Sequence, residues 1–268
     1  MTPRPRGARR APVLALSAAL VVLLAACAGG ADAPPGTERT TGSEDRSGEP
    51  EGEVAVFAAA SLAAAFDEIA TLAQERYPAL TVRLTTDGSA TLVTQLEQGA
   101  PADVLATADE ATMAGAAEAG LVLEPASFAT NVLVIAVPAG NPEGVTSLGD
   151  LVTLDVVTCA PEVPCGAAAA RAFDAADVDV APVSEEQAVS AVVAKVAAGE
   201  ADAGLVYATD VLGAESELES VEIPDAPVNT YPIAVAAGSP NPAAADAFVE
   251  LVLSEEGQRV LAAHGFSP

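Results

Sequence analysis

Two kinds of apolar segment alternate along the chain from about residue 54 onward. Short continuous runs such as "VAVFAAA" (54–60) are typical of buried strands, whereas "SLAAAFDEIATLAQERYP" (61–78) has its apolar residues at helical spacing. The apolar residues on one face of that helix are Leu62, Phe66, Ile69 and Ala73. The pattern therefore predicts a buried strand that leads into an amphipathic helix.

The same alternation continues to the end of the chain. The predicted strands are 54–60, 81–86, 103–108, 131–140, 154–160, 203–209 and 231–238. The predicted helices are 61–78, 89–101, 110–120, 166–176, 185–199, 242–254 and 255–265. Strands that alternate with helices indicate an α/β fold, in which a mostly parallel sheet is covered by helices on both faces.

The elements fall into two groups of similar size, which predicts two lobes. The first lobe consists of residues 53–130 together with 232–268, and the second of residues 131–231. A strand near Asn131 is expected to lead into the second lobe, and one near Tyr231 to lead back. A cleft between two lobes is a common place for a ligand.

The N-terminus has the features of an export signal. Four arginines precede an apolar segment, 11–26, which is shorter than the roughly 20 residues of a membrane span. It ends in "LLAAC" (23–27), which resembles the lipobox of bacterial lipoproteins. We therefore expect a lipoprotein signal peptide at 1–26 and a lipid anchor on Cys27, so that the protein is held outside the cytoplasm at the cell membrane. The alternative is an ordinary signal peptide with an incidental cysteine.

The segment after Cys27 cannot form a packed core. Residues 27–52 are rich in Gly, Pro, Ser, Thr and acidic residues, which predicts a flexible acidic tether. The whole chain of 268 residues has 11 basic and 38 acidic residues and a net charge of −27. Such a charge makes nucleic acid a poor partner, because its phosphates would be repelled. High solubility in an exposed or salty place is the simplest reason for the acidity.

Two cysteines remain besides Cys27, in the segment "CAPEVPC". Cys159 and Cys165 form an even pair in a chain that is expected to be exported, so a structural disulfide is predicted. A metal or redox site is the weaker alternative. Two sulfurs supply only half of a zinc site, and the spacing is not C-x-x-C.

Serines stand at two junctions between a strand and a helix. Ser61 follows the first predicted strand, and Ser89 follows the second within "TTDGSATL" (85–92). The start of a helix offers unpaired N–H groups and partial positive charge, which together favour an anion. The alternative for Ser61 is that it simply caps its helix. Further helix starts occur near Cys165 and Val189, and Tyr207 lies near the end of a strand.

This combination resembles the periplasmic molybdate-binding proteins of ABC importers, which have the type II fold of substrate-binding proteins. The segments that carry the resemblance are "VFAAASL" (56–62), "TLVTQLEQGAPADVLATAD" (91–109), "PEVPCG" (161–166), "GLVYATD" (204–210), "YPIAVAAG" (231–238) and "HGF" (264–266). The resemblance implies a monomeric protein without a cofactor, which delivers molybdate or tungstate to an ABC permease in the membrane.

The resemblance also implies which residues hold the oxyanion. These are the hydroxyls of Ser61, Ser89 and Tyr207 and the backbone N–H groups of Cys165 and Val189. All five are neutral donors. A ring of donors satisfies an ion that carries no proton, and it rejects protonated phosphate, whose O–H would lack an acceptor. Sulfate must then be excluded by size.

Asp87, two residues before Ser89, departs from what the resemblance leads us to expect, because a carboxylate in the site could accept a hydrogen bond from phosphate. We expect it to point away from the site or to cap the helix.

Other functions have less support. A binding protein for sulfate or phosphate, or an oxyanion sensor, would keep the same cleft. An enzyme is disfavoured because the single histidine, His264, lies at the very end of the chain, where we expect it to be packed or exposed. The sequence also contains no Walker loop, H-E-x-x-H motif or dinucleotide fingerprint.

Overall fold

The computed structural model describes residues 49–268. The predicted signal peptide, the predicted lipidation of Cys27 and most of the predicted tether lie outside the described residues. The first strand begins at Gly52, the last residue assigned to the tether. None of the helices within residues 49–268 combines the length and the apolar character that crossing a membrane requires.

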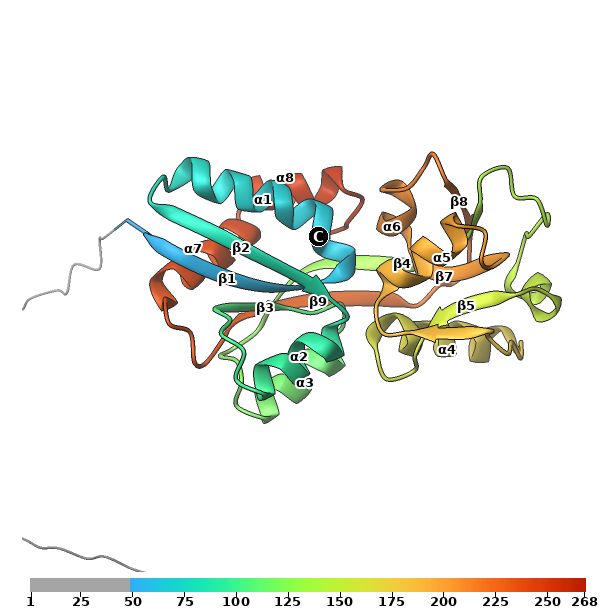
Figure 1. The fold of residues 1–268 in the computed structure, drawn as a ribbon, viewed down its shortest axis with the longest axis horizontal. Coiled ribbons are helices and arrows are strands. Elements are labelled where there is room, and N and C mark those ends of the chain that lie inside the picture. Colours follow the sequence, from blue (N-terminus) through green and yellow to red (C-terminus); the bar gives the residue numbers. More distant parts are fainter. Residues whose placement is uncertain (1–48) are drawn as a thin grey trace, which may run out of the picture. The chain divides into compact units, whose positions relative to one another are not determined.

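Strands and helices alternate over most of the described chain (Figure 1). The strands are β1 (Gly52–Ala59), β2 (Leu80–Asp87), β3 (Val104–Ala106), β4 (Ala126–Pro138), β5 (Val156–Cys159), β6 (Ser184–Glu186), β7 (Ala203–Tyr207), β8 (Leu218–Glu222) and β9 (Val228–Val235). The helices are η1 (Ala60–Leu62), α1 (Ala63–Arg76), α2 (Ser89–Glu97), α3 (Glu110–Glu118), η2 (Leu148–Thr153), α4 (Pro164–Ala176), α5 (Val189–Ala197), α6 (Ala208–Leu212), α7 (Pro242–Leu253) and α8 (Glu255–Ala263), where η marks a 3₁₀ helix.

The strands pair in the order β2-β1-β3-β9-β4-β7-β5-β6, and β8 also pairs with β4. Strand β4 changes partners along its length: residues 126–132 pair with β9, and residues 133–138 pair with β7 and β8. We call β2, β1, β3, β9 and the first section of β4 the first sheet part, and the remainder the second sheet part. Strand β1 pairs in parallel with β2 and β3, and β5 pairs in parallel with β6 and β7, whereas every pairing of β4 or β9 is antiparallel.

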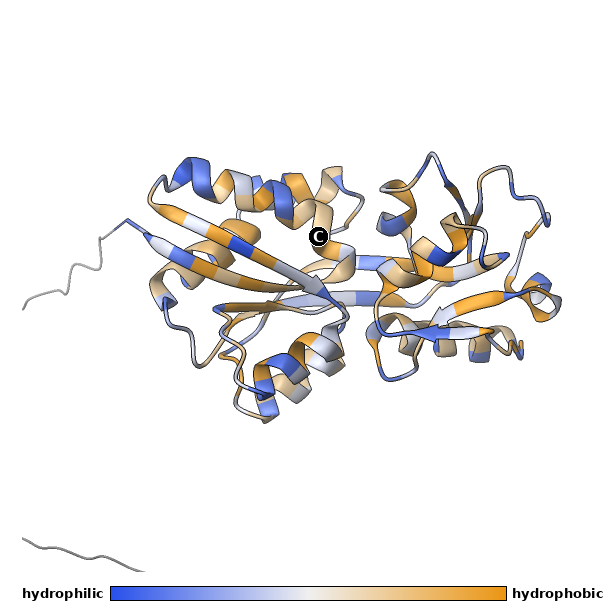
Figure 2. Cartoon of the chain, in the orientation of Figure 1, coloured by the Kyte–Doolittle hydropathy of each residue, from blue (hydrophilic) through white to orange (hydrophobic). Residues whose placement is uncertain are grey.

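Helices cover both faces of the first sheet part. Along β1, Val56 and Ala58 belong to one buried cluster and Phe57 to another, because successive side chains of a strand point to opposite faces. The first cluster includes Phe66 of α1, and the second includes Leu92 of α2. Figure 1 shows α1, α7 and α8 on one side of these strands and α2 and α3 on the other, and Figure 2 shows polar and apolar residues mixed along the helices. The predicted α/β architecture is confirmed.

Several short elements differ from the sequence prediction, among them the 3₁₀ helix η2, which was not predicted. Residues 184–186 form β6, so the helix predicted to begin at residue 185 begins at Val189. Strand β8 and the five-residue helix α6 were not predicted. Strands β6 and β8 lie at sheet edges and are rich in acidic residues, so no apolar pattern marks them in the sequence. Backbone pairing of β6 with β5 and of β8 with β4 decides their conformation.

The predicted disulfide between Cys159 and Cys165 is present, with 5.6 Å between the Cα atoms. It joins the end of β5 to the first turn of α4, and the chain beside it is tightly packed. A Cβ atom on Gly166 would lie 1.9 Å from the carbonyl oxygen of Ala160, so only glycine fits there. The disulfide and this contact together fix the position at which α4 begins.

We expect the double variant Cys159→Ala, Cys165→Ala to lose about 2 kcal/mol of unfolding free energy, because the bond closes a short loop and restricts the unfolded chain. Urea unfolding measures the loss. Reductant should shift the midpoint of the wild type toward that of the variant and leave the variant unchanged. Equal midpoints for oxidised wild type and variant would contradict the expectation.

Candidate functional site

A small cavity lies where the starts of several helices meet. Its volume is about 10 Å³, room for roughly one water-sized sphere. The residues that line it are Ala59, Ala60, Ser61, Gly88, Ser89, Ala108, Val163, Pro164, Cys165, Val189 and Tyr207. The first six come from the strand ends and helix starts of the first sheet part, and the other five from those of the second.

All five residues that the sequence singled out line this one cavity, namely Ser61, Ser89, Cys165, Val189 and Tyr207. They come from five different elements: η1, α2, α4, α5 and the end of β7. The sequence placed each at the junction of a strand and a helix, and the fold brings these junctions together. None of the lining residues carries a charge.

The helix starts at the cavity lack side-chain caps. The residues that precede η1, α2, α4 and α5 are Ala59, Gly88, Val163 and Ala188, and none has a polar side chain. By contrast, Asp109 caps α3 and Ser254 caps α8 through hydrogen bonds to backbone N–H groups. The first N–H groups of the cavity helices therefore remain available as donors, and the helix dipoles add partial positive charge.

Neither serine of the site acts as a helix cap. Ser61 lies within η1, and its Oγ is 3.0 Å from Oη of Tyr231. Ser89 is the first residue of α2, is 2% exposed, and its Oγ accepts a hydrogen bond of 3.1 Å from the backbone N–H of Ala108. The capping alternative that the sequence left open for Ser61 is therefore wrong, and Ser89 does not cap a helix either.

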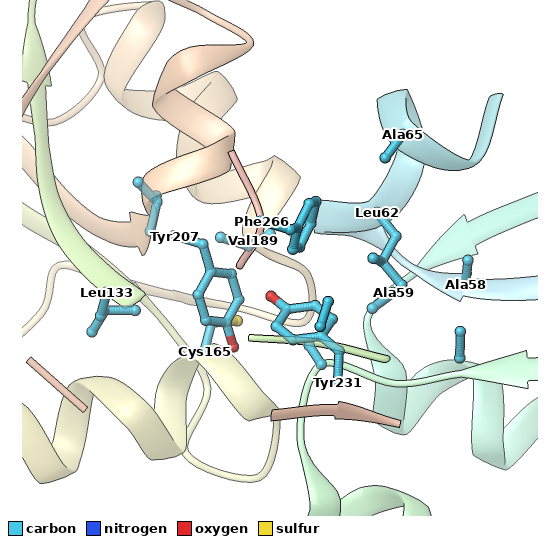
Figure 3. Close-up of a cluster of buried hydrophobic side chains, with 14 of the residues drawn as sticks. Ala58, Ala59, Leu62, Ala65, Leu133, Cys165, Val189, Tyr207, Tyr231 and Phe266 are labelled. Carbon is cyan, nitrogen blue, oxygen red and sulfur yellow. The ribbon is translucent and has the colours of Figure 1, made fainter. Parts of the chain in front are cut away.

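Tyr207 and Tyr231 form the aromatic wall beside the cavity. Figure 3 shows the two rings next to each other, with Cys165 and Val189 near Tyr207. The ring centroids are 5.8 Å apart, with an interplanar angle of 69°. Burial raises the pKa of Tyr207 well above its ordinary value, and burial likewise raises the pKa of Tyr231. Both hydroxyls therefore keep their protons and can donate hydrogen bonds.

Acidic residues near the site point elsewhere. Asp87 accepts a hydrogen bond of 2.7 Å from the N–H of Gly88 and does not line the cavity. Asp210, in α6, accepts one of 2.9 Å from the N–H of Tyr207. Burial raises the pKa of Asp210 to about 7, and the bond from Tyr207 only partly opposes this shift.

The structure adds residues that the sequence reasoning did not single out. Tyr231 contacts Ser61, and Asn229 contacts Tyr207 and the guanidinium of Arg171. Tyr231 belongs to a segment that carries the family resemblance, whereas no sequence signal marked the other two. His264 does not line the cavity, and its Nε2 lies 2.9 Å from a carboxylate oxygen of Glu68.

The two sheet parts approach each other closely at Gly88. A Cβ atom at this position would lie 1.8 Å from the carbonyl oxygen of Gln187, which precedes α5. The φ angle of Gly88 is −59°, which any residue can adopt. Glycine is therefore required here by the neighbouring chain rather than by local backbone conformation.

Comparison with known proteins agrees with this fold. Residues 54–267 match the model of the bacterial extracellular solute-binding protein family. The molybdate-binding protein ModA of Mycobacterium tuberculosis is 42% identical over 257 residues, which cover 94% of this chain and 95% of that protein.

Solved structures with the same fold include the periplasmic molybdate-binding protein of Azotobacter vinelandii. Its TM-score is 0.68 at 16% identity, over 80% of this chain and 99% of that one. The sulfate-binding protein SubI of Mycobacterium tuberculosis has a TM-score of 0.67 at 22% identity, over 81% of this chain and 86% of that one. The expected type II fold of periplasmic binding proteins is confirmed.

We expect Asp210→Asn to become more stable relative to the wild type as the pH rises from about 4 to about 7. An unfolded aspartate has a pKa of about 4. Because the folded pKa is raised, ionisation of Asp210 increasingly opposes folding across this window. Urea unfolding of both proteins at several pH values measures the difference.

Asp150→Asn is the control, because its stability relative to the wild type should change with pH in the opposite direction. Hydrogen bonds from Thr146 and Ser147 lower the pKa of Asp150, so its contribution to stability is present at higher pH and lost as the pH falls. This variant should become less stable relative to the wild type as the pH rises from below 4 to about 5, and the difference should then stay constant up to about pH 7. A pH-independent difference for Asp210→Asn would contradict the expectation.

Proposed function

We propose that the chain binds molybdate and delivers it to an ABC permease. It belongs to the bacterial extracellular solute-binding protein family. The observation that carries the proposal is the set of uncapped helix starts and hydroxyls around one small cavity. Helix starts of this kind bind anions. The ModA relative, 42% identical over nearly its full length, supports molybdate as the ion.

The chemistry of the lining supports a tetrahedral oxyanion without a proton. The proposed ligand residues are Ser61, Ser89, Cys165, Val189 and Tyr207, three of them donating through hydroxyls and two through backbone N–H groups. No charged residue lines the cavity, so short hydrogen bonds rather than charge neutralisation would hold the ion. Tungstate has the same shape and charge as molybdate, and the proposal includes it.

The negative charge of the protein does not prevent such binding. At physiological salt, charges more than about 8 Å away are largely screened, so donors in direct contact decide the affinity. Asp87, the acidic residue closest in sequence to a proposed ligand residue, bonds to Gly88 instead of facing the cavity.

We further propose that the two sheet parts act as lobes that close over the ion. The lobes are those expected from the sequence, residues 53–130 with 232–268 and residues 131–231. Strands β4 and β9 connect them and would act as the hinge. The small cavity and the close approach at Gly88 are the features of a closed arrangement.

The remaining proposals concern the setting of the protein. The chain acts outside the cytoplasm as a monomer without a cofactor. A lipid on Cys27 anchors it to the membrane, and residues 27–52 provide the tether. Its role is binding and not catalysis, as in the family to which it belongs.

Thermal denaturation with four oxyanions tests the ligand. We expect molybdate and tungstate to raise the melting temperature of the wild type by mass action, and phosphate to leave it unchanged. Tyr207→Phe should reduce the molybdate shift, because it removes one donor. A rise with sulfate alone would favour the sulfate alternative, and no rise with any of the four would contradict oxyanion binding.

Gly88→Ala tests closure. The added Cβ would meet the carbonyl of Gln187 only when the lobes are closed, so molybdate affinity should fall about tenfold or more. The melting temperature without ligand should change little. Gly115→Ala, in α3 with nothing within 4 Å of the added atom, is the matched control. Calorimetric affinities that are equal for the two variants would count against closure at this contact.

A further inference from the structure

Asn229 connects the cavity to the surface of the protein. It lies in β9 opposite Asn131 of β4 and is 2% exposed. Its Nδ2 is 2.9 Å from Oη of Tyr207 and 3.0 Å from the carbonyl oxygen of Ala108, and its Oδ1 is 3.0 Å from a guanidinium nitrogen of Arg171. Tyr207 and Ala108 line the cavity, whereas Arg171 is an exposed residue of α4.

The partners of Asn229 allow only one orientation of its amide. The guanidinium of Arg171 can only donate hydrogen bonds, so the atom that faces it must be the oxygen Oδ1. The carbonyl of Ala108 can only accept, so the atom that faces it must be the nitrogen Nδ2. A flipped amide would oppose donor to donor and acceptor to acceptor.

This orientation makes Tyr207 accept a hydrogen bond from Asn229. The amide nitrogen has no free lone pair, so it cannot accept the proton of the hydroxyl. Burial keeps that hydroxyl protonated. Because the Tyr207 oxygen accepts from Asn229, its proton must go to another acceptor. The acceptors within reach are the neighbouring Tyr231 hydroxyl and an oxygen of an ion in the cavity that Tyr207 lines.

The same residue, Ala108, also acts on Ser89. Its N–H donates to Oγ of Ser89, while its C=O accepts from Asn229. The oxygens of Ser89 and Tyr207 therefore each accept a hydrogen bond from another group of the protein. Both hydroxyls are left to donate, Ser89 into the cavity and Tyr207 to an ion there or to the neighbouring Tyr231 hydroxyl.

We propose that Asn229, oriented by Arg171 and Ala108, is a positioning residue that commits Tyr207 to donate and thereby selects oxyanions that carry no proton. This inference rests on the proposed function and names the residues that set its selectivity. An ion that offers only acceptors satisfies a committed donor, whereas a protonated oxygen meets hydrogen against hydrogen.

Asn229→Asp reverses the hydrogen bond to Tyr207. A carboxylate accepts but does not donate, so the Tyr207 hydroxyl would turn its proton toward position 229 and its lone pairs toward the ligand. Pairing with Arg171 is retained. We expect molybdate affinity to fall roughly 10- to 100-fold in calorimetry, and the ratio of molybdate to phosphate affinity to fall with it.

The added negative charge would itself repel an anion, so the substitution is repeated in a Tyr207→Phe background. In that background the added charge remains, but there is no hydroxyl whose hydrogen bond could reverse its direction. Residues that act through one another give non-additive effects. The loss caused by Asn229→Asp should therefore be several-fold smaller in that background, and the molybdate-to-phosphate ratio should no longer respond to it.

The outcomes separate this inference from the proposed function. A wild type that does not bind molybdate contradicts the proposed function. A wild type that binds, with the same loss from Asn229→Asp in both backgrounds, overturns the positioning role alone.

Arg171→Met provides a test that does not depend on folding at the buried position. It removes one of the two constraints on the amide, so molybdate affinity should fall about threefold to tenfold with Tyr207 present and less with Phe in its place. Arg83→Met removes the same charge from an exposed residue of β2 paired with Glu53, and it should leave the affinity unchanged. Equal affinities for Arg171→Met and Arg83→Met would overturn the role of Arg171.

Discussion

The structure depends on unpaired backbone donors at helix starts that meet at one point. The residues that precede these helices are Ala59, Gly88, Val163 and Ala188, none of which can cap a helix with its side chain. Asp109 and Ser254 cap α3 and α8 in the usual way, whereas α7, away from the cavity, begins without a side-chain cap. Small apolar residues at the cavity thus leave N–H groups unsatisfied, and an anion is the ligand that would satisfy them.

Keeping such donors together requires tight contacts between distant segments. Gly88 approaches the carbonyl of Gln187 too closely for any side chain, and Gly166 does the same with Ala160. The disulfide fixes the start of α4 at the end of β5. Strand β4 pairs first with β9 and then with β7, so one continuous strand carries both sheet parts. These contacts hold the lining segments of the cavity close together.

In the proposed site, whose lining carries no formal charge, the hydroxyls would add selectivity. A helix start attracts anions in general, but a hydroxyl can donate or accept, and its surroundings decide which. The N–H of Ala108 and the amide of Asn229 occupy the oxygens of Ser89 and Tyr207. Such a site would distinguish unprotonated from protonated oxyanions without using a charged residue. It could do so even in a chain with a net charge of −27.

The sequence alone was sufficient for the α/β class, for most helices and strands, for the disulfide and for the gathering of Ser61, Ser89, Cys165, Val189 and Tyr207. Local apolar periodicity and recognisable motifs carry that information. It did not reveal β6 and β8, because short acidic edge strands form through pairing with distant strands. Nor did it reveal Asn229 and Arg171, which lie 58 residues apart and meet only in the folded chain. A hydrogen bond has a direction that depends on every partner around it, so the orientation of the Tyr207 proton arises from three-dimensional contacts and leaves no mark in the local sequence.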